Sequence, residues 1–175
     1  MEVTLTRNQS VSDNLDALIV GGSLVGKIGW TASDIHEDPL TGRTELVATT
    51  ALKNEFGFMT HWNGKDVHVP ARPMFRNTIR REVYNWFHTM ERGAQFVLDG
   101  QIPFEKVLDS VTKEAIQDVR DTVQYRLTPP LSPLTLRLRL TRSIMRRSGG
   151  LASGTLPLYD TGHMMRTLTN EVIAE

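Results

Sequence analysis

The chain has 175 residues, and its 20 basic and 20 acidic side chains give a formal net charge of zero. Because nucleic-acid-binding domains are usually markedly basic, this balance disfavours a dedicated nucleic-acid binder. The chain has no cysteine, which excludes disulfide bonds, thiolate catalysis and cysteine-ligated zinc. The length and an ordinary hydrophobic fraction of 39% predict a single domain with a real core.

The polar N-terminal segment, residues 1–24, matches no element that we can place. It contains no basic segment that leads into an apolar run, so no signal peptide is predicted. Nowhere does the sequence approach the ~18 consecutive apolar residues of a membrane span. We therefore expect a soluble protein that is made in the cytoplasm and has no membrane partner.

Alternation and turn residues organise the next part of the chain. Residues 25–33 (VGKIGWTAS) alternate between two faces, which predicts a strand. Residues 34–43 carry acidic residues, proline and glycine, and they predict an exposed, flexible loop. Thr44 is the predicted cap of a helix through ELVATTALKNEFG that stops at Gly57.

Two prolines introduce the longest periodic segment. Ahead of them, Asn63-Gly64 predicts a β-hairpin, because a type I′ turn needs positive φ at both central residues. Pro70 and Pro73 then predict an extended approach to a helix. Apolar residues at three- and four-residue spacing predict that this long amphipathic helix ends near Gly100. They are Phe75, Ile79, Val83, Trp86, Met90, Ala94 and Val97.

The C-terminal part of the sequence adds a second long helix. It starts near Pro103, and its polar positions alternate in sign, which is typical of a solvated face. Residues 128–133 (TPPLSP) end this helix. The basic segment 134–147 predicts a last helical piece, and the Gly/Ser-rich segment 147–157 predicts a flexible loop. A short helix and a terminal strand are expected to follow.

One stretch imitates a nucleotide site. Gly21, Gly26 and Lys27 have the spacing of a phosphate loop, but Ile28 occupies the place of the magnesium-binding Ser or Thr. The residues that follow also alternate like a strand, whereas a phosphate loop opens a helix. We therefore reject an ATPase.

Histidines and carboxylates do not form a catalytic pattern. His61 and His68 flank the hairpin, and acidic residues cluster at 34–38, but none has the spacing of a catalytic zinc site. No nucleophile elbow is present either. We expect no enzymatic activity, no metal and no cofactor.

Arginines form two clusters for which the composition leaves two interpretations open. The first cluster opens the long helix and comprises Arg72, Arg76, Arg80 and Arg81; the second lies in the last helical piece and includes Arg137, Arg142 and Arg146. Each cluster is either a solvated face or a contact with an acidic protein surface or with DNA phosphate.

Four segments, taken in order, resemble the tail-completion or head–tail joining proteins of long-tailed bacteriophages. They are ALKNEFG (51–57), VPARPMFRNTI (69–79), PPLSPLT (129–135) and PLYDTGHMMRTLTNEV (157–172). The resemblance covers residues 25–173. One departure is Met74, which stands between Pro73 and Phe75 where the family commonly runs from proline directly into phenylalanine.

The resemblance implies a single α+β domain over 25–175, with a small mixed or antiparallel sheet flanked by two long helices. It also implies a virion structural protein of the neck, at the head–tail junction. There, copies of the chain form a ring with other neck, portal-side or tail-tube proteins, and DNA passes through the lumen without sequence-specific binding. A tail terminator that caps the tail tube is a related alternative. A DNA-binding accessory protein that uses Arg137–Arg147 is an alternative of another class.

The motif residues are expected to determine the fold. They are Phe56, Gly57, Pro70, Pro73, Phe75, Asp160, Thr161 and Gly162. Phe75 is expected to begin the buried stripe of the long helix, and Asp160 or Thr161 to cap the last short helix. The four arginines of the first cluster are expected to stay outside, available for carboxylates of a neighbouring subunit, because a ring joins two different surfaces of each copy.

Overall fold

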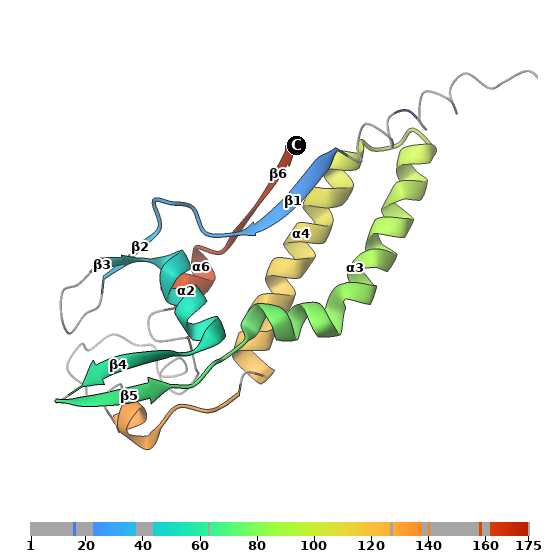
Figure 1. Ribbon diagram of the computed structural model, residues 1–175. Coiled ribbons are helices and arrows are strands. Elements are labelled where there is room, and N and C mark those ends of the chain that lie inside the picture. Colours follow the sequence, from blue (N-terminus) through green and yellow to red (C-terminus); the bar gives the residue numbers. More distant parts are fainter. Residues whose placement is uncertain are drawn as a thin grey trace, which may run out of the picture. The chain divides into compact units, whose positions relative to one another are not determined.

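The computed structural model describes residues 16, 23–37, 44–62, 64–126, 128–137, 140, 158 and 162–174 (Figure 1). The chain divides into two compact units. Unit 1 contains β1, β6, the later part of α3 and most of α4. Unit 2 contains the remaining elements together with the start of α3 and the end of α4. The predicted α+β class is confirmed.

The strands of the described residues form three two-stranded sheets. In unit 1, β1 (Leu24–Gly29) pairs with β6 (Thr169–Ala174). In unit 2, β2 (Ile35–Glu37) pairs with β3 (Thr44–Leu46), and β4 (Phe58–Trp62) pairs with β5 (Lys65–Val69). The predicted first and last strands are therefore present.

The segment predicted as one exposed loop, residues 34–43, is partly a strand. Ile35 is the register partner of Leu46 in the antiparallel β2–β3 pair. The helix predicted from Thr44 consequently begins three residues later, as α2 (Val47–Phe56). Backbone pairing with β2 outweighs the helix-capping tendency of Thr44. Residues 38–43 lie outside the described part of the chain.

The predicted hairpin is confirmed. The antiparallel β4–β5 register runs from Phe58 opposite Val69 to Trp62 opposite Lys65, which leaves a two-residue loop. Gly64 has φ 75°, as a type I′ turn requires. Asn63 lies outside the described residues.

The first long helix, α3 (Met74–Leu98), has the predicted extent. Its buried stripe begins one residue earlier than expected, because Met74 is fully buried whereas Phe75 is half-buried. Ile79, which the spacing assigned to the buried stripe, is exposed. Met74 thus takes the core position at the start of the helix, and Phe75 packs against the same core.

The second long helix, α4 (Phe104–Asp121), continues into a π-helical turn over Thr122–Arg126. Its predicted apolar positions are buried; they are Val107, Val111, Ile116, Val119 and Val123. A short helical piece follows at residues 133–137. The loop predicted at 147–157 lies outside the described residues. No helix of the described part is long and apolar enough to cross a membrane.

Two glycines allow close packing against α4 in unit 1. A Cβ added at Gly93 of α3 would collide with the methyl groups of Val107 on α4. One added at Gly26 of β1 would come within 2.6 Å of the Thr112 methyl group. Both glycines therefore allow a strand or helix to approach α4 more closely than any side chain would.

Unit 2 has a core in which distant parts of the sequence meet. Ala51, Met74, Val123 and Met165 are fully buried together, and half-buried apolar side chains surround them. Trp30 is one of these. Its ring meets Phe75 edge to face with centroids 5.7 Å apart, and its Nε1 donates to the Met164 carbonyl over 2.8 Å. The short helix α6 (His163–Arg166) closes this core, as predicted.

Candidate functional site

Glu55, at the end of α2, starts the long helix α3. Its side chain is only 5% exposed, and its carboxylate accepts hydrogen bonds from the backbone N–H groups of Phe75 and Arg76, each over 3.1 Å. The first N–H groups of a helix have no partner within the helix, and a carboxylate there also meets the positive end of the helix dipole. Glu55 thus caps a helix that begins nineteen positions later in the chain.

Arg76 returns the contact from the helix side. Its Nε donates to Glu55 Oε1 over 3.1 Å, and its Nη2 donates to the Glu55 carbonyl oxygen over 2.6 Å. The guanidinium carbon lies 4.7 Å from the centre of the Phe56 ring, a cation–π arrangement. Phe56 itself is 61% exposed. Helix α2 turns Phe56, one of the expected fold determinants, toward solvent, where its ring contacts Arg76.

Gly57 explains why the chain can turn sharply between the two segments. Its φ is 78°, and a Cβ there would lie 2.8 Å from the Ala71 nitrogen and 2.9 Å from the Val69 carbonyl oxygen. The Arg72 N–H also donates to the Asn54 carbonyl over 2.7 Å. The segments ALKNEFG and VPARPMFR are therefore one interlocked structure.

Arg72 does not stay outside, as its place in the first arginine cluster led us to expect. Its side chain is 7% exposed, and burial lowers the pKa of its guanidinium. The Nε donates to the Pro129 carbonyl over 3.1 Å and Nη2 donates to the Pro130 carbonyl over 3.3 Å. Arg72 thereby fastens the PPLSP segment to the start of α3.

The other arginines of the two clusters differ in their surroundings. Arg81 is half-buried, and its Nη2 donates over 2.9 Å to the hydroxyl of Thr122, which lies 2.6 Å from that of Thr78. Arg80 is exposed, and so is Arg137. Arg142 and Arg146 lie outside the described residues.

The last motif is held by an arginine that the sequence did not single out. Arg120 of α4 donates through Nε to the Met165 carbonyl over 3.1 Å and through Nη2 to the Leu168 carbonyl over 3.3 Å. Helix α6 begins after Gly162, which has φ 68° and provides no side-chain cap. Gly162 occupies the N-cap position in a left-handed conformation. Asp160 and Thr161 lie outside the described residues.

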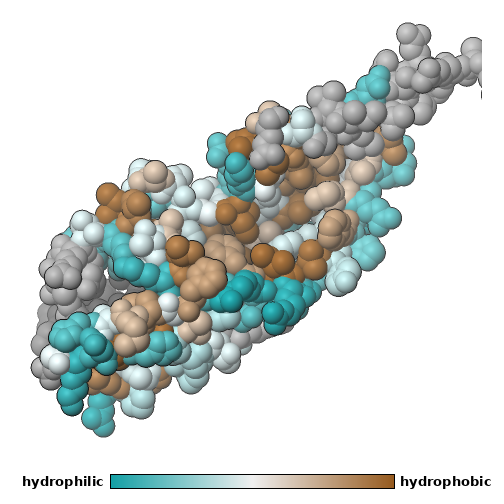
Figure 2. All heavy atoms as spheres, viewed as in Figure 1, coloured by the Kyte–Doolittle hydropathy of each residue, from teal (hydrophilic) through white to brown (hydrophobic). Residues whose placement is uncertain are grey.

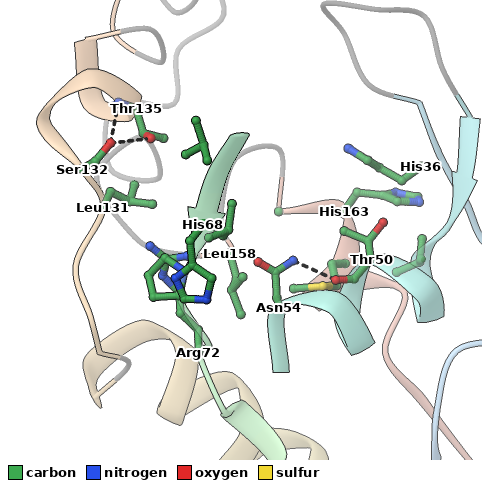
Figure 3. Close-up of a pocket in the computed structure, with 16 residues that line it drawn as sticks. His36, Thr50, Asn54, His68, Arg72, Leu131, Ser132, Thr135, Leu158 and His163 are labelled. Atoms are coloured by element: carbon green, nitrogen blue, oxygen red, sulfur yellow. Dashed lines mark hydrogen bonds between the residues drawn. The ribbon is translucent and has the colours of Figure 1, made fainter. Parts of the chain in front are cut away.

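A cavity of about 410 Å³ lies in unit 2 (Figure 3). Its walls combine apolar residues with polar and basic ones: His36, Val47, Thr50, Asn54, Val67, His68, Val69, Pro70, Arg72, Leu131, Ser132, Thr135, Leu158, Gly162, His163 and Met164. The rings of His36 and His163 are stacked with centroids 6.3 Å apart. The Ser132 hydroxyl lies 2.9 Å from that of Thr135 and accepts a hydrogen bond from the Thr135 N–H over 3.1 Å.

The phosphate-loop-like stretch and the hairpin histidines, which the sequence did not support as active sites, lie in strands. Gly26 and Lys27, from the phosphate-loop imitation, lie in the middle of strand β1. His61 pairs with Asp66 across the hairpin at 2.9 Å, with both side chains exposed. Among the residues that the structure describes, no three histidines, aspartates or glutamates gather in a way that would hold a metal ion.

No protein-family model, no curated protein and no solved structure matches this chain. Function is therefore inferred from the residues themselves. The side chains that join the motif segments were only partly predictable: Glu55, Arg120 and Trp30 were missed. The only sequence signal for Glu55 was its place in ALKNEFG, directly before Phe56 and Gly57.

Proposed function

We propose that this chain is a virion structural protein of the phage neck, one that completes the head–tail junction as a ring. The observation that carries the proposal is that the first three segments and the described residues 158 and 162–169 of the fourth belong to unit 2 and are held there by specific contacts. Glu55 and Arg76 join the first segment to the second, Arg72 joins the second to the third, and Trp30 and Arg120 hold the fourth.

This interlocking gives the resemblance a physical basis. Each segment alone is a weak motif, but the first three are joined by side-chain contacts. The fourth places Met165 in one core with Ala51 of the first and Met74 of the second. Such mutual support is expected of a fold in which each local sequence agrees with the global structure.

The surface also suits a protein that works by assembly. Large apolar side chains are exposed on both units, including Phe56, Met59 and Trp62 on unit 2 and Tyr84 and Phe87 on unit 1. Figure 2 shows apolar side chains reaching the surface among hydrophilic ones. Exposed apolar groups that gather in this way mark sites of protein contact.

Two alternatives receive less support. A tail terminator would use the same fold at the end of the tail tube, and the chain itself does not separate it from a neck protein. A DNA-binding accessory protein would use the segment Arg137–Arg147, and the zero net charge of the chain disfavours it. Of the basic segment Arg137–Arg147, the structure describes residue 140 and exposed Arg137.

The deciding experiment is electron microscopy of particles of the encoding phage, assembled with and without this protein. We expect filled heads and separate tails in its absence, and joined particles once the purified protein is added. Tailed particles of normal number without the protein would contradict the neck proposal. Tails of uncontrolled length in its absence would favour the terminator.

A measurement of DNA binding distinguishes the neck protein from a DNA-binding accessory protein. The neck proposal expects weak binding that vanishes at moderate salt. High affinity with a steep dependence on salt concentration would favour the accessory protein, because each neutralised phosphate adds to that slope.

A further inference from the structure

Unit 2 carries an exposed surface that combines apolar and basic groups, here called the basic patch. It comprises Leu52, Phe56, Arg76, Ile79 and Arg80. The contact between Arg76 and the Phe56 ring joins α2 to α3. The other members lie three or four residues from Phe56 or Arg76 on their own helices, the spacing that places side chains side by side. All five are exposed.

The charge of the basic patch comes mainly from Arg80. Arg76 is partly neutralised by Glu55, whose carboxylate is 3.1 Å from its Nε. Within the described part of the chain, Arg80 forms no ion pair. The patch therefore offers two exposed aliphatic groups, an aromatic ring already covered on one face by a guanidinium, and one free cation.

Unit 1 carries a complementary surface on α3, here called the acidic stripe. It comprises Tyr84, Phe87 and Glu91. Tyr84 is 75% exposed and Phe87 is 63% exposed. Spacings of three and four residues place all three side chains on one helix face. Glu91 is exposed and, among the described residues, pairs with the exposed His88 at 3.3 Å, a pairing that solvent screens strongly.

We infer that the basic patch of one copy docks on the acidic stripe of the next copy in the ring. The inference rests on the proposed neck function. Aromatic and arginine side chains are the groups that interface centres favour, and both surfaces are rich in them. Arg80 and Glu91 supply opposite charges at the edges of the two surfaces, and such pairs fix the register of a contact.

A second copy fits better than another occupant for two reasons. Each copy presents both surfaces, so a contact between unlike surfaces can repeat head to tail from copy to copy, as a ring requires. Nucleic acid would need cations rather than the aliphatic side chains of Leu52 and Ile79, because phosphate contacts dominate its binding.

The absence of native cysteine makes a specific cross-linking test possible. A double variant, Arg80→Cys with Glu91→Cys, is assembled into particles and treated with a short bis-maleimide. We expect a ladder of covalent oligomers. The single variants should give no covalent dimer alone, and mixed with each other they should give dimers and nothing larger.

A matched control replaces Arg80→Cys with Gln124→Cys, which is exposed on unit 2 outside the patch, and it should abolish the ladder. Cross-linking of Arg80→Cys to itself would overturn the head-to-tail contact. A missing ladder in particles that contain the protein and have joined would sink this inference while leaving the neck function intact. If the protein is not needed for joining at all, the neck function itself fails.

Charge reversal gives an independent reading. Arg80→Glu places two carboxylates together, and the yield of joined particles should fall at least about tenfold. Adding Glu91→Arg to the same chain should restore most of that yield. If the double variant is no better than Arg80→Glu, the two residues do not meet.

Discussion

The two units of the molecule are stabilised in different ways. Unit 1 brings α3, α4 and β1 together through positions without bulk, where Gly93 faces Val107 and Gly26 faces Thr112. Unit 2 uses long charged side chains that reach the backbone of segments far away in the chain. Glu55 binds N–H groups of α3, and Arg72 binds carbonyls of Pro129 and Pro130.

This difference determines how each unit responds to substitution. Where two side chains meet, as Gly93 and Val107 do, a clash can be relieved by changing the other side chain. Where a side chain meets backbone, no second substitution can replace the lost partner. Variants in unit 2 should therefore be harder to rescue than variants in unit 1, and the following predictions test that contrast.

Glu55→Gln should have the largest effect. It keeps the size of the side chain but removes the charge from a buried helix cap and from the contact with Arg76. Hydrogen bonds to charged groups contribute about 1.5–3 kcal/mol each, so we expect the free energy of unfolding to fall by about 3 kcal/mol. Urea unfolding followed by circular dichroism measures this. The exposed Glu105→Gln, in the first turn of α4, is the control.

A loss at Glu55→Gln no greater than that at Glu105→Gln would contradict the cap. Loss of the Glu55 charge should not be compensated by any second substitution in unit 2, because two of its partners are backbone N–H groups.

Arg72→Met should rank second. Methionine keeps the apolar part of the side chain and fills similar space, but it cannot donate to the Pro129 and Pro130 carbonyls. We expect the free energy of unfolding to fall by about 2 kcal/mol. Hydrogen exchange should also rise in residues 128–137, which Arg72 fastens. Arg80→Met, on the exposed face of α3, should change the free energy of unfolding by no more than about 0.5 kcal/mol.

Gly93→Ala tests unit 1. Alanine gains about 1 kcal/mol of helix propensity over glycine, but overpacking against Val107 costs about 1–3 kcal/mol, so a net loss of about 1 kcal/mol is expected. Adding Val107→Ala should make the glycine replacement favourable, because the obstacle is then gone. In thermal denaturation, Gly93→Ala should lower the melting temperature when Val107 is present and raise it in the Val107→Ala variant. The same change in both proteins would mean that the two positions do not touch.

Glu45→Gln should have the smallest effect, and it should depend on pH. A hydrogen bond from Lys53, with a second from Thr50, lowers the pKa of Glu45 below its ordinary value of 4.5. Its contribution to stability is therefore present above pH 4.5 and is lost as the pH falls through the lowered pKa. Because the pair of Glu45 and Lys53 is exposed, we expect Glu45→Gln to lower the free energy of unfolding by about 0.5 kcal/mol at pH 7. Melting temperatures of both proteins should converge by strongly acidic pH; a constant difference would refute the pairing.

The sequence predicted unit 1 better than unit 2 for a physical reason. The buried positions of α3 and α4 recur with the helical period, so spacing alone identified Val97 and Val107 as core. The contacts of Glu55, Arg72 and Arg120 join residues 20 to 57 positions apart, and no local pattern encodes them. Charged residues at the start of a helix were consequently assigned to solvent, although Arg72 is buried.

Local sequence patterns also failed to identify the exposed residues of the proposed contact. Phe56 lies in an apolar position of α2 and was assigned to the fold, but it is exposed beneath the Arg76 guanidinium. Tyr84 and Phe87 belong to a long helix whose buried stripe was predicted only in part, and both side chains are exposed. Periodicity identifies the side of a helix that is buried, and it does not say what later covers the opposite side.

The cap at Glu55 has a consequence for the timing of assembly. One carboxylate both starts α3 and holds Arg76 over Phe56, so the basic patch exists only once α2 and α3 have met. A newly made chain in which these helices are still apart has no surface to offer a neighbour. Under the proposed ring contact, folding of a copy therefore has to precede its assembly, because the surface that a neighbour would meet forms only when α2 and α3 are in place.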